Sequence, residues 1–489
     1  MDWHCLLKED RLVPDRIPEP REWGKYNISG FEKDYKKIVA SSAFRRLQDK
    51  TQVFPLDKSD FIRTRLTHSI EVSMTAKQLG TMVCTYLSDN KHSQKTAFPM
   101  EEATPKRMGE ILMCAGLLHD LGNPPFGHFG ETVIGSWFQK HFADPSFSFA
   151  GKEISTLLTP QMRGDLEHFE GNAQSLRLLL KSCNSSAGDL NLTNAVIHTL
   201  LKYPTDSVRF DKNAADIRLH KNGYFAAEEQ ALLAIAESLG TKTDSQMARH
   251  PLTYLLEAAD DIAYATADLE DAFKKGLFSL EQFVDFFEEE LHRIARKQDR
   301  KIPPKAMQLI SPLSVAVRNK GRAREQDLCT FNNWVRYARG WLMYCAAFGF
   351  TRNYISIMNG EYPCDLFAGT YHEFSIEALK NAMNRFAYHS SGIVKLELSA
   401  QTILTFLLDQ FVPAVLYFGE APEKGTQSAA GRKYTDLISE NYRSDYLSCR
   451  REDDDGYNLY LRFLLVTDYI SGMTDSFAKN LYQELNGIS

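Results

Sequence analysis

Apolar residues recur at helical spacing along most of this 489-residue chain, whereas alternating, strand-like segments bounded by hairpin turns are hard to find. In the segment 107–122 they share one helical face, and Gly122 followed by Pro124 and Pro125 is a strong helix stop. The sequence therefore predicts an all-α fold. Further helices are expected at about 33–50, 68–88, 165–181, 191–202, 226–239, 251–274, 279–297, 331–347, 375–388, 399–417 and 457–486.

The composition is that of an ordinary globular chain with a large core. Hydrophobic residues make up 43% and charged residues 25%, which excludes disordered, collagen-like and coiled-coil chains. The formal net charge of −6 indicates no general affinity for polyanions. Two basic runs, 296–301 and 318–324, are the clearest local charge concentrations, and such runs are more often solvated than phosphate-binding.

Cysteine usage and the absence of a targeting pattern indicate a soluble cytoplasmic protein. The eight cysteines are scattered without a C-x-x-C pair, which fits a reducing compartment. The first residues lack the basic and apolar regions of an export signal. Asp409 and Pro413 interrupt the most apolar stretch, 403–418, so we expect no membrane span.

Three separated segments carry side chains that suit a divalent metal ion. His119 and Asp120 end the apolar helix of 107–122, His68 begins an amphipathic helix, and Asp260 lies in a helix of small and apolar residues. Imidazole nitrogen and carboxylate oxygen are a usual ligand set for such an ion. Taken singly, each residue is more often structural, but their order and spacing together favour a metal site.

The downstream helix also carries a polar stripe. Asp260, Tyr264 and Asp268 stand at i, i+4 and i+8, so they lie on one slowly drifting face. Alanine and isoleucine surround them, which predicts close helix packing. Buried carboxylates in such a setting need a partner, and a metal ion is a good one.

The surrounding sequence resembles the deoxyguanosine triphosphate triphosphohydrolase (dGTPase) branch of the HD-domain metal-dependent phosphohydrolases. The H…HD…D order is that superfamily's signature. The likeness extends from residue 44 to residue 475. The segments that carry it are FRRLQDKTQVFPL, RTRLTHSIEV, HDLGNPPFGHFGE, HFEGNAQSLRLL, TLLKYP, EAADDIAYATADLEDA and DYISGMTD. Because these words span most of the chain, we expect one helical body over 1–489, with an HD catalytic core at 44–275 and a helical part at 276–489 that completes the site and makes oligomer contacts.

The resemblance implies a metal held by His68, His119, Asp120 and Asp260. Choosing Asp260 instead of Asp261 brings the family's Tyr and second Asp onto residues 264 and 268 of this chain. Mn²⁺ or Mg²⁺ is expected, and Fe, Co or Ni would also suit the mixed nitrogen and oxygen ligands.

The resemblance also implies that His128 and Glu131 act together near the scissile bond. At this spacing a carboxylate can contact an imidazole if a helix begins there. Glu131 would hold the tautomer of His128, which would transfer a proton or assist attack.

In that family, hydrolysis separates the sugar 5′ oxygen from the α-phosphorus and releases a deoxynucleoside and intact triphosphate. A tetra-anionic tail needs several donors besides the metal. The residues that match the family's words are Arg65, Asn172, Lys202, Tyr203 and Lys221.

The resemblance places Gln52, Tyr264 and Asp268 around the sugar, where a tyrosine ring would leave little room for a 2′ hydroxyl. Val53 could pack on the base. Arg462 is a candidate for contact with the site of a neighbouring subunit.

The sequence and its resemblance to this family are compatible with three functions. The leading one is hydrolysis of dGTP, or of dNTPs broadly, for control of the deoxynucleotide pool. The second is another HD phosphohydrolase acting on alarmones, cyclic nucleotides or mononucleotides. The third is a nucleic-acid-binding regulatory HD protein. The resemblance further implies a homo-oligomer, often a hexamer, and an effector that is single-stranded DNA or a dNTP.

Overall fold

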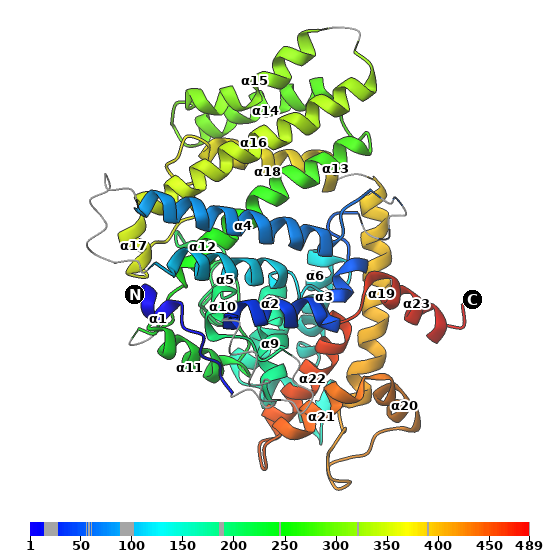
Figure 1. Ribbon diagram of the computed structural model, residues 1–489. Coiled ribbons are helices and arrows are strands. Elements are labelled where there is room, and N and C mark those ends of the chain that lie inside the picture. Colours follow the sequence, from blue (N-terminus) through cyan, green and yellow to red (C-terminus); the bar gives the residue numbers. More distant parts are fainter. Residues whose placement is uncertain are drawn as a thin grey trace.

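The structure is a computed structural model that describes residues 1–13, 28–54, 56, 59, 61–88, 102–184, 190–243, 246–319, 322–388 and 391–488. It is an all-α fold in a single body, as the sequence predicts (Figure 1). Within the described ranges the strands are confined to one two-residue hairpin, in which β1 (Ser148–Phe149) pairs antiparallel with β2 (Lys152–Glu153).

The helices of the first half supply most of the candidate site. They are α1 (Trp3–Leu6), α2 (Gly30–Ala40), α3 (Ser42–Arg46), η2 (Leu47–Asp49), α4 (Arg65–Ser88), α5 (Thr104–Leu118), α6 (Gly127–Phe142), α7 (Ile154–Leu157), α8 (Pro160–Glu167), α9 (Gly171–Asn184), α10 (Asn194–Thr199), η4 (Ile217–Leu219), α11 (Glu229–Leu239), α12 (Pro251–Ala263), the π-helical turn η5 (Tyr264–Asp268) and α13 (Leu269–Lys274).

The second half adds a helical layer and a C-terminal group. These helices are α14 (Leu280–Lys297), α15 (Pro304–Arg318), α16 (Arg324–Arg352), α17 (Tyr354–Met358), α18 (Glu373–Met383), the π-helical turn η6 (Asn384–Tyr388), α19 (Ser391–Val415), α20 (Ala429–Leu437), α21 (Glu440–Cys449), α22 (Asp455–Ser471) and α23 (Asp475–Leu485).

Several expected helices are interrupted, and the residues at the breaks explain why. The segment 33–50 is interrupted at Ser41, which is extended (φ −72°, ψ 148°) and whose hydroxyl accepts from the backbone N–H of Phe44. The segment 457–486 is interrupted between α22 and α23, where Thr474 caps the second helix. Short polar side chains compete for backbone groups in this way and favour helix starts. The segment 165–181 is likewise divided, by residues 168–170.

Two long helices have no counterpart in the sequence prediction. α6 begins at Gly127, inside the Gly/Pro-rich segment that reads as a loop. α15 begins with Pro304 at its first turn and contains Pro312 in its interior. Proline is well tolerated in the first turn of a helix because its missing N–H has no intrahelical partner there, whereas interior proline usually argues against a helix.

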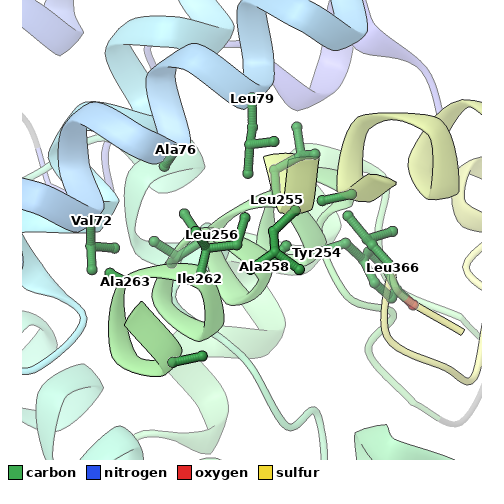
Figure 2. Packing of buried hydrophobic residues seen from close by; sticks show 14 of the residues in the cluster. Val72, Ala76, Leu79, Tyr254, Leu255, Leu256, Ala258, Ile262, Ala263 and Leu366 are labelled. Atoms are coloured by element: carbon green, nitrogen blue, oxygen red, sulfur yellow. The ribbon is translucent and has the colours of Figure 1, made fainter. Parts of the chain in front are cut away.

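The packing of α4 on α12 positions two of the predicted metal ligands. Val72 and Leu79 on α4 point toward Ala263 and Leu255 on α12 in a core of aliphatic side chains (Figure 2). α5 packs on α4 as well. Burial of these side chains contributes about 25 cal/mol per Å² of apolar surface, so the three helices form a rigid base.

Buried apolar residues fall into two clusters, which we call the first core and the second core. The first core includes residues of α4, α5, α12, α14, α16 and α18. The second core includes residues of α6, α19, α22 and α23. In Figure 1, α14, α15, α16 and α18 lie above α4. The helices α19 and α23 lie at the right of the view, near the C-terminus.

Among the described residues, one helix is long and apolar enough to cross a membrane, Ile393–Val415 within α19, and half of its most apolar part is buried inside the protein. Asp409 accepts a hydrogen bond from Nε1 of Trp137 on α6 at 2.7 Å. Leu404, Leu407 and Leu408 belong to the second core. These contacts are those of a core helix.

Candidate metal centre and active site

A cavity of about 560 Å³ gathers most of the residues that the sequence singles out. It has the size of small-molecule sites in general. The predicted residues that line it are Gln52, Val53, Arg65, His68, His119, Asp120, His128, Asn172, Lys202, Tyr203, Lys221, Asp260 and Tyr264.

At the cavity wall three potential metal ligands from three helices converge. His68 lies in the first turn of α4, His119 directly follows α5, and Asp260 lies on α12. One donor atom from each lies within 4.8 Å of the others. Asp260 Oδ1 is 3.2 Å from Nε2 of His68 and 3.5 Å from Nε2 of His119.

The orientation of His119 fits a metal ligand. Its Nδ1 is 2.9 Å from the carbonyl oxygen of Gly116, which makes Nδ1 the protonated nitrogen and leaves a lone pair on Nε2. That Nε2 is buried and has no hydrogen-bond partner among the described residues. Burial lowers the pKa of His119, but the charges of Asp120 and Asp260 outweigh it and raise the pKa to about 9, so Nε2 binds a cation strongly, either a proton or a metal ion in place of the proton. A divalent cation suits this donor set.

Asp120 lies beside this group but has other partners. Its Oδ2 accepts from Nη1 of Arg65 at 2.7 Å and is 3.5 Å from Nε2 of His119, and its Oδ1 accepts from the side-chain amide of Asn123. Burial opposes ionisation of Asp120, yet the Arg65 guanidinium holds its pKa well below the usual range. Asp120 is therefore an ionised carboxylate at the edge of the three-residue cluster.

His128 and Glu131 form the pair that the sequence predicts, because α6 begins at Gly127. Nδ1 of His128 is 2.9 Å from Oε2 of Glu131, and Oε1 of Glu131 accepts from the backbone N–H of Gly171 at 2.9 Å. The His128 side chain is 75% exposed at the cavity, whereas Glu131 is 9% exposed behind it. The hydrogen bond to Glu131 raises the pKa of His128. The other ring nitrogen of His128, Nε2, makes no bond to Glu131 and is the one available to a substrate.

Each of four cations along the cavity has a carboxylate partner. Nη1 of Arg65 lies 2.7 Å from Asp120, and Nζ of Lys202 lies 3.6 Å from Asp260. Burial lowers the pKa of Lys202, but the neighbouring negative charges outweigh it and raise the pKa above its ordinary value. The other two pairs, which are both 2.8 Å apart, are Lys221 with Glu170 and Lys380 with Asp261.

Glu170 organises two of the predicted phosphate-binding residues. Its Oε1 accepts from Nζ of Lys221 and from the side-chain amide of Asn172, each at 2.8 Å. The carboxylate is buried, and burial raises its pKa. Glu170 stands in the word FEGNAQ two residues before Asn172, so its acidic character could have identified it from the sequence.

The predicted sugar-binding stripe is interrupted by η5. Tyr264 lines the cavity, and its ring is stacked on Tyr388 with centroids 6.4 Å apart and an angle of 16° between the planes. Asp268 is fully buried, does not line the cavity, and has no hydrogen-bond partner among the described residues for either carboxylate oxygen. Burial raises the pKa of Asp268 well above its ordinary value.

Arg462 is fully buried in α22, away from the cavity. Its guanidinium pairs with Glu420, lies 3.3 Å from the hydroxyl of Tyr446 and stands over the ring of Phe149. An ion pair of this kind is costly to open. In this structure the side chain of Arg462 is thus buried against Phe149 of the second core and faces no outer surface.

The sequence prediction missed several cavity residues that come from distant segments. Lys380 on α18 and Tyr388 in η6 belong to the C-terminal half, and no motif marks them. Their neighbours Asp261 and Tyr264 are in a recognisable word, but only the packing of α18 against η5 brings the two segments together.

Comparisons with known proteins show which family this chain belongs to. The HD domain model matches residues 65–157, which include three of the four predicted ligands. A deoxyguanosinetriphosphate triphosphohydrolase-like protein of Listeria innocua is 42% identical over the whole of both chains. One of Synechocystis is 32% identical, again over both whole chains. A deoxyguanosinetriphosphate triphosphohydrolase of Yersinia enterocolitica is 32% identical over 93% of each chain. The chain therefore belongs to the deoxyguanosinetriphosphate triphosphohydrolase family of HD-domain phosphohydrolases.

Proposed function

We propose that this protein hydrolyses dGTP, or dNTPs broadly, to a deoxynucleoside and inorganic triphosphate, and so controls the deoxynucleotide pool. One observation carries the proposal: the cluster of His68, His119 and Asp260 shares a cavity with the His128–Glu131 pair. The full-length relatives named for this activity support the choice of substrate class.

In the proposed site His68, His119 and Asp260 hold the divalent ion, with Asp120 beside them as the fourth ligand. Mn²⁺ or Mg²⁺ is proposed, and Fe, Co or Ni would also suit these ligands. When bound, the ion would supply charge for a phosphoryl oxygen and would acidify a water molecule. The residues of the chain hold and orient the substrate.

The proposed proton carrier is Nε2 of His128. Glu131 fixes the ring by accepting from Nδ1 and is itself fixed by the N–H of Gly171. Water adds to the α-phosphorus, the bond from that phosphorus to the 5′ oxygen breaks, and the 5′ oxygen leaves with a proton. His128 can take a proton from the water or give one to the leaving oxygen, as general acid–base catalysis requires.

The cations Arg65, Lys202 and Lys221 would bind the triphosphate, together with Asn172 and Tyr203. Tyr264 would pack under the deoxyribose, Gln52 would bond the 3′ hydroxyl, and Val53 would contact the base. The predicted bond from Asp268 to the 3′ hydroxyl would require a rearrangement, because the buried Asp268 does not line the cavity. The side-chain oxygen of Gln52 is buried without a hydrogen-bond partner among the described residues, which leaves it an acceptor for a hydroxyl.

Product analysis tests the proposal. The protein is incubated with Mn²⁺ and each dNTP in ¹⁸O-labelled water, and products are separated by ion exchange. The expected products are unlabelled deoxynucleoside and tripolyphosphate that carries the label. Stepwise release of orthophosphate, or turnover of alarmones or cyclic nucleotides in place of dNTPs, would show a different HD phosphohydrolase. Binding of DNA without turnover would indicate a regulatory protein.

A soluble, cytoplasmic protein is proposed as well. The seven cysteines among the described side chains are free, as expected in a reducing compartment. Two predictions about partners remain: that the protein is a homo-oligomer, such as a hexamer, and that its effector is single-stranded DNA or a dNTP.

The two basic runs that the sequence singles out contain paired arginines. Arg300 pairs with Glu373, and Arg322 pairs with Asp327, while residues 320 and 321 lie outside the described ranges.

A further inference from the structure

The turn between α22 and α23 contacts the active-site segments, although its residues do not line the cavity. Asp475, the first residue of α23, is 2% exposed. Its Oδ2 accepts from the backbone N–H and the hydroxyl of Thr51 at 3.0 and 2.5 Å, and its Oδ1 accepts from the backbone N–H of Phe126 at 2.9 Å. One carboxylate thus joins two segments that lie 75 residues apart, from 51 to 126.

Both segments carry residues of the proposed reaction. Thr51 directly precedes Gln52 and Val53, which line the cavity. Phe126 is the residue before α6, two positions before His128. The position of Asp475 therefore sets the separation between the proposed sugar and base contacts and the proposed proton carrier.

Lys50 makes a second connection across the same place. Its Nζ donates to the carbonyl oxygens of Asn123 and Ser471, each at 2.6 Å, and the side chain is 2% exposed. Asn123 lies in the turn between α5 and α6, and Ser471 ends α22. A buried ammonium needs such partners, because an unpaired one would be costly.

The backbone at the start of α6 needs this support. Phe126 has φ +65° and Gly127 has φ +62°, both in the left-handed region, which is unfavourable for a residue with a bulky side chain. Strained conformations persist where surrounding bonds over-determine them. The bonds from Phe126 to Asp475 and from Lys50 to Asn123 supply that restraint from outside the segment.

The contacts also cross from one core to the other. Leu47 and Val53, on either side of Lys50, belong to the first core, whereas Phe126, Met473 and Ala478 belong to the second core. The cavity takes its proposed metal ligands from helices of the first core and His128 from a helix of the second. A fixed relation between the cores is thus a condition for the geometry of the site.

We propose that Asp475 and Lys50 are positioning residues, which hold residues 51–53 and the start of α6 at the separation that catalysis requires. The inference rests on the proposed function. It makes the C-terminal helix α23 necessary for efficient turnover without any contact of that helix with substrate.

Asp475→Asn is the sharpest test. Asparagine has the size of aspartate, but its NH₂ group must face either Thr51 or Phe126, so one of the two segments loses its acceptor. Ser476→Ala is the matched control, because Ser476 follows Asp475 in the first turn of α23 and its hydroxyl donates to Asp49 at 2.9 Å. Both proteins are assayed with Mn²⁺ and dGTP, with kcat expressed per bound metal ion. Amide hydrogen exchange is followed at Thr51 and Phe126.

In Asp475→Asn we expect exchange at Thr51 or Phe126 to accelerate and kcat to fall by about tenfold to a hundredfold, because small displacements of reacting groups have effects of that order. Bound metal should change by less than about threefold on the same reasoning, since the metal cluster is not attached to Asp475. KM should rise if the segment that loses its acceptor is the one that carries Gln52 and Val53. Ser476→Ala should match the wild-type protein in every measurement.

An unchanged kcat in a folded Asp475→Asn protein would overturn the inference. So would an equal loss of activity, metal and melting temperature in both variants, because that pattern indicates only a structural role. If Asp475→Asn does not fold, Lys50→Met is measured in the same way, and the same loss of kcat is expected. If the wild-type protein hydrolyses no dNTP, the proposed function fails. The positioning role is contradicted separately if amide exchange at Thr51 and Phe126 is the same in Asp475→Asn as in the wild-type protein.

Discussion

Oε1 of Glu170 lies 2.8 Å from Nζ of Lys221, so an acidic residue holds a cation at the wall of a cavity that is proposed to bind a polyanion. The same oxygen accepts from the side chain of Asn172. We interpret Glu170 as the residue that orients both phosphate-binding groups before substrate arrives, because preorganised donors lose less entropy on binding.

Glu170→Gln should raise KM for dGTP by about tenfold, with a smaller effect on kcat, because the neutral amide no longer orients Lys221. Steady-state kinetics would measure the change. Glu167→Gln is the matched control, since Glu167 pairs with Arg163 on α8 and does not line the main cavity. A lower KM in Glu170→Gln would mean that Glu170 competes with the triphosphate for Lys221.

His68→Ala should remove the bound metal and abolish turnover, because it deletes one of three ligands whose donor atoms lie within 4.8 Å. Metal content after gel filtration and product formation are the measurements. His141→Ala is the control, as that ring stacks on Trp137 outside the cavity. A chelator should reproduce the effect in the wild-type protein, and Mn²⁺ should reverse it. Retention of metal by His68→Ala would contradict the ligand assignment.

Glu131→Gln should lower the pKa of His128, because the hydrogen bond and the charge of Glu131 raise it in the wild-type protein. A raised folded-state pKa means that the protonated pair stabilises the fold fully below the ordinary histidine pKa of about 6.5. This contribution is lost as the pH rises through the folded-state pKa. NMR titration of the His128 ring measures the shift. An identical pKa in both proteins would show that the 2.9 Å contact does not persist in solution.

Tyr264→Ala should weaken discrimination against ribonucleotides. The ring of Tyr264 is supported by Tyr388, so the pair presents a fixed surface to a sugar. Loss of such a steric contact is worth about 10–200-fold in the ratio of kcat/KM for dGTP to that for GTP. Tyr264→Phe, which keeps the ring, should retain the ratio. Equal ratios in all three proteins would exclude Tyr264 from sugar selection.

The sequence anticipates the parts of the site that are local. His119 and Asp120 follow directly from a helix stop, and the contact of His128 with Glu131 follows from three-residue spacing once α6 begins at Gly127. The convergence of His68 and Asp260, 192 residues apart, was expected only through the resemblance to a family. Spacing rules act within one element, whereas packing between elements has no such periodic signal.

Residues that act from distant segments escaped prediction for the same reason. Lys380 reaches the cavity only because α18 packs on η5, and Asp475 only because the turn before α23 meets residues 51 and 126. Asp475 ends the word DYISGMTD, but nothing local to that word indicates which residues Asp475 contacts.

The π-helical turn η5 also changes how the helix from 251 to 274 can be altered. A π turn accommodates one extra residue, and each residue in an α-helix corresponds to about 100° of rotation. The π turn therefore lets Asp260 on α12 face the cavity while the face of α13 that carries Leu269 and Phe273 stays buried. Deletion of one residue within 264–268 would leave a regular helix with both faces in place. The same deletion within α13 would rotate the residues after it by about 100° and misdirect their buried face.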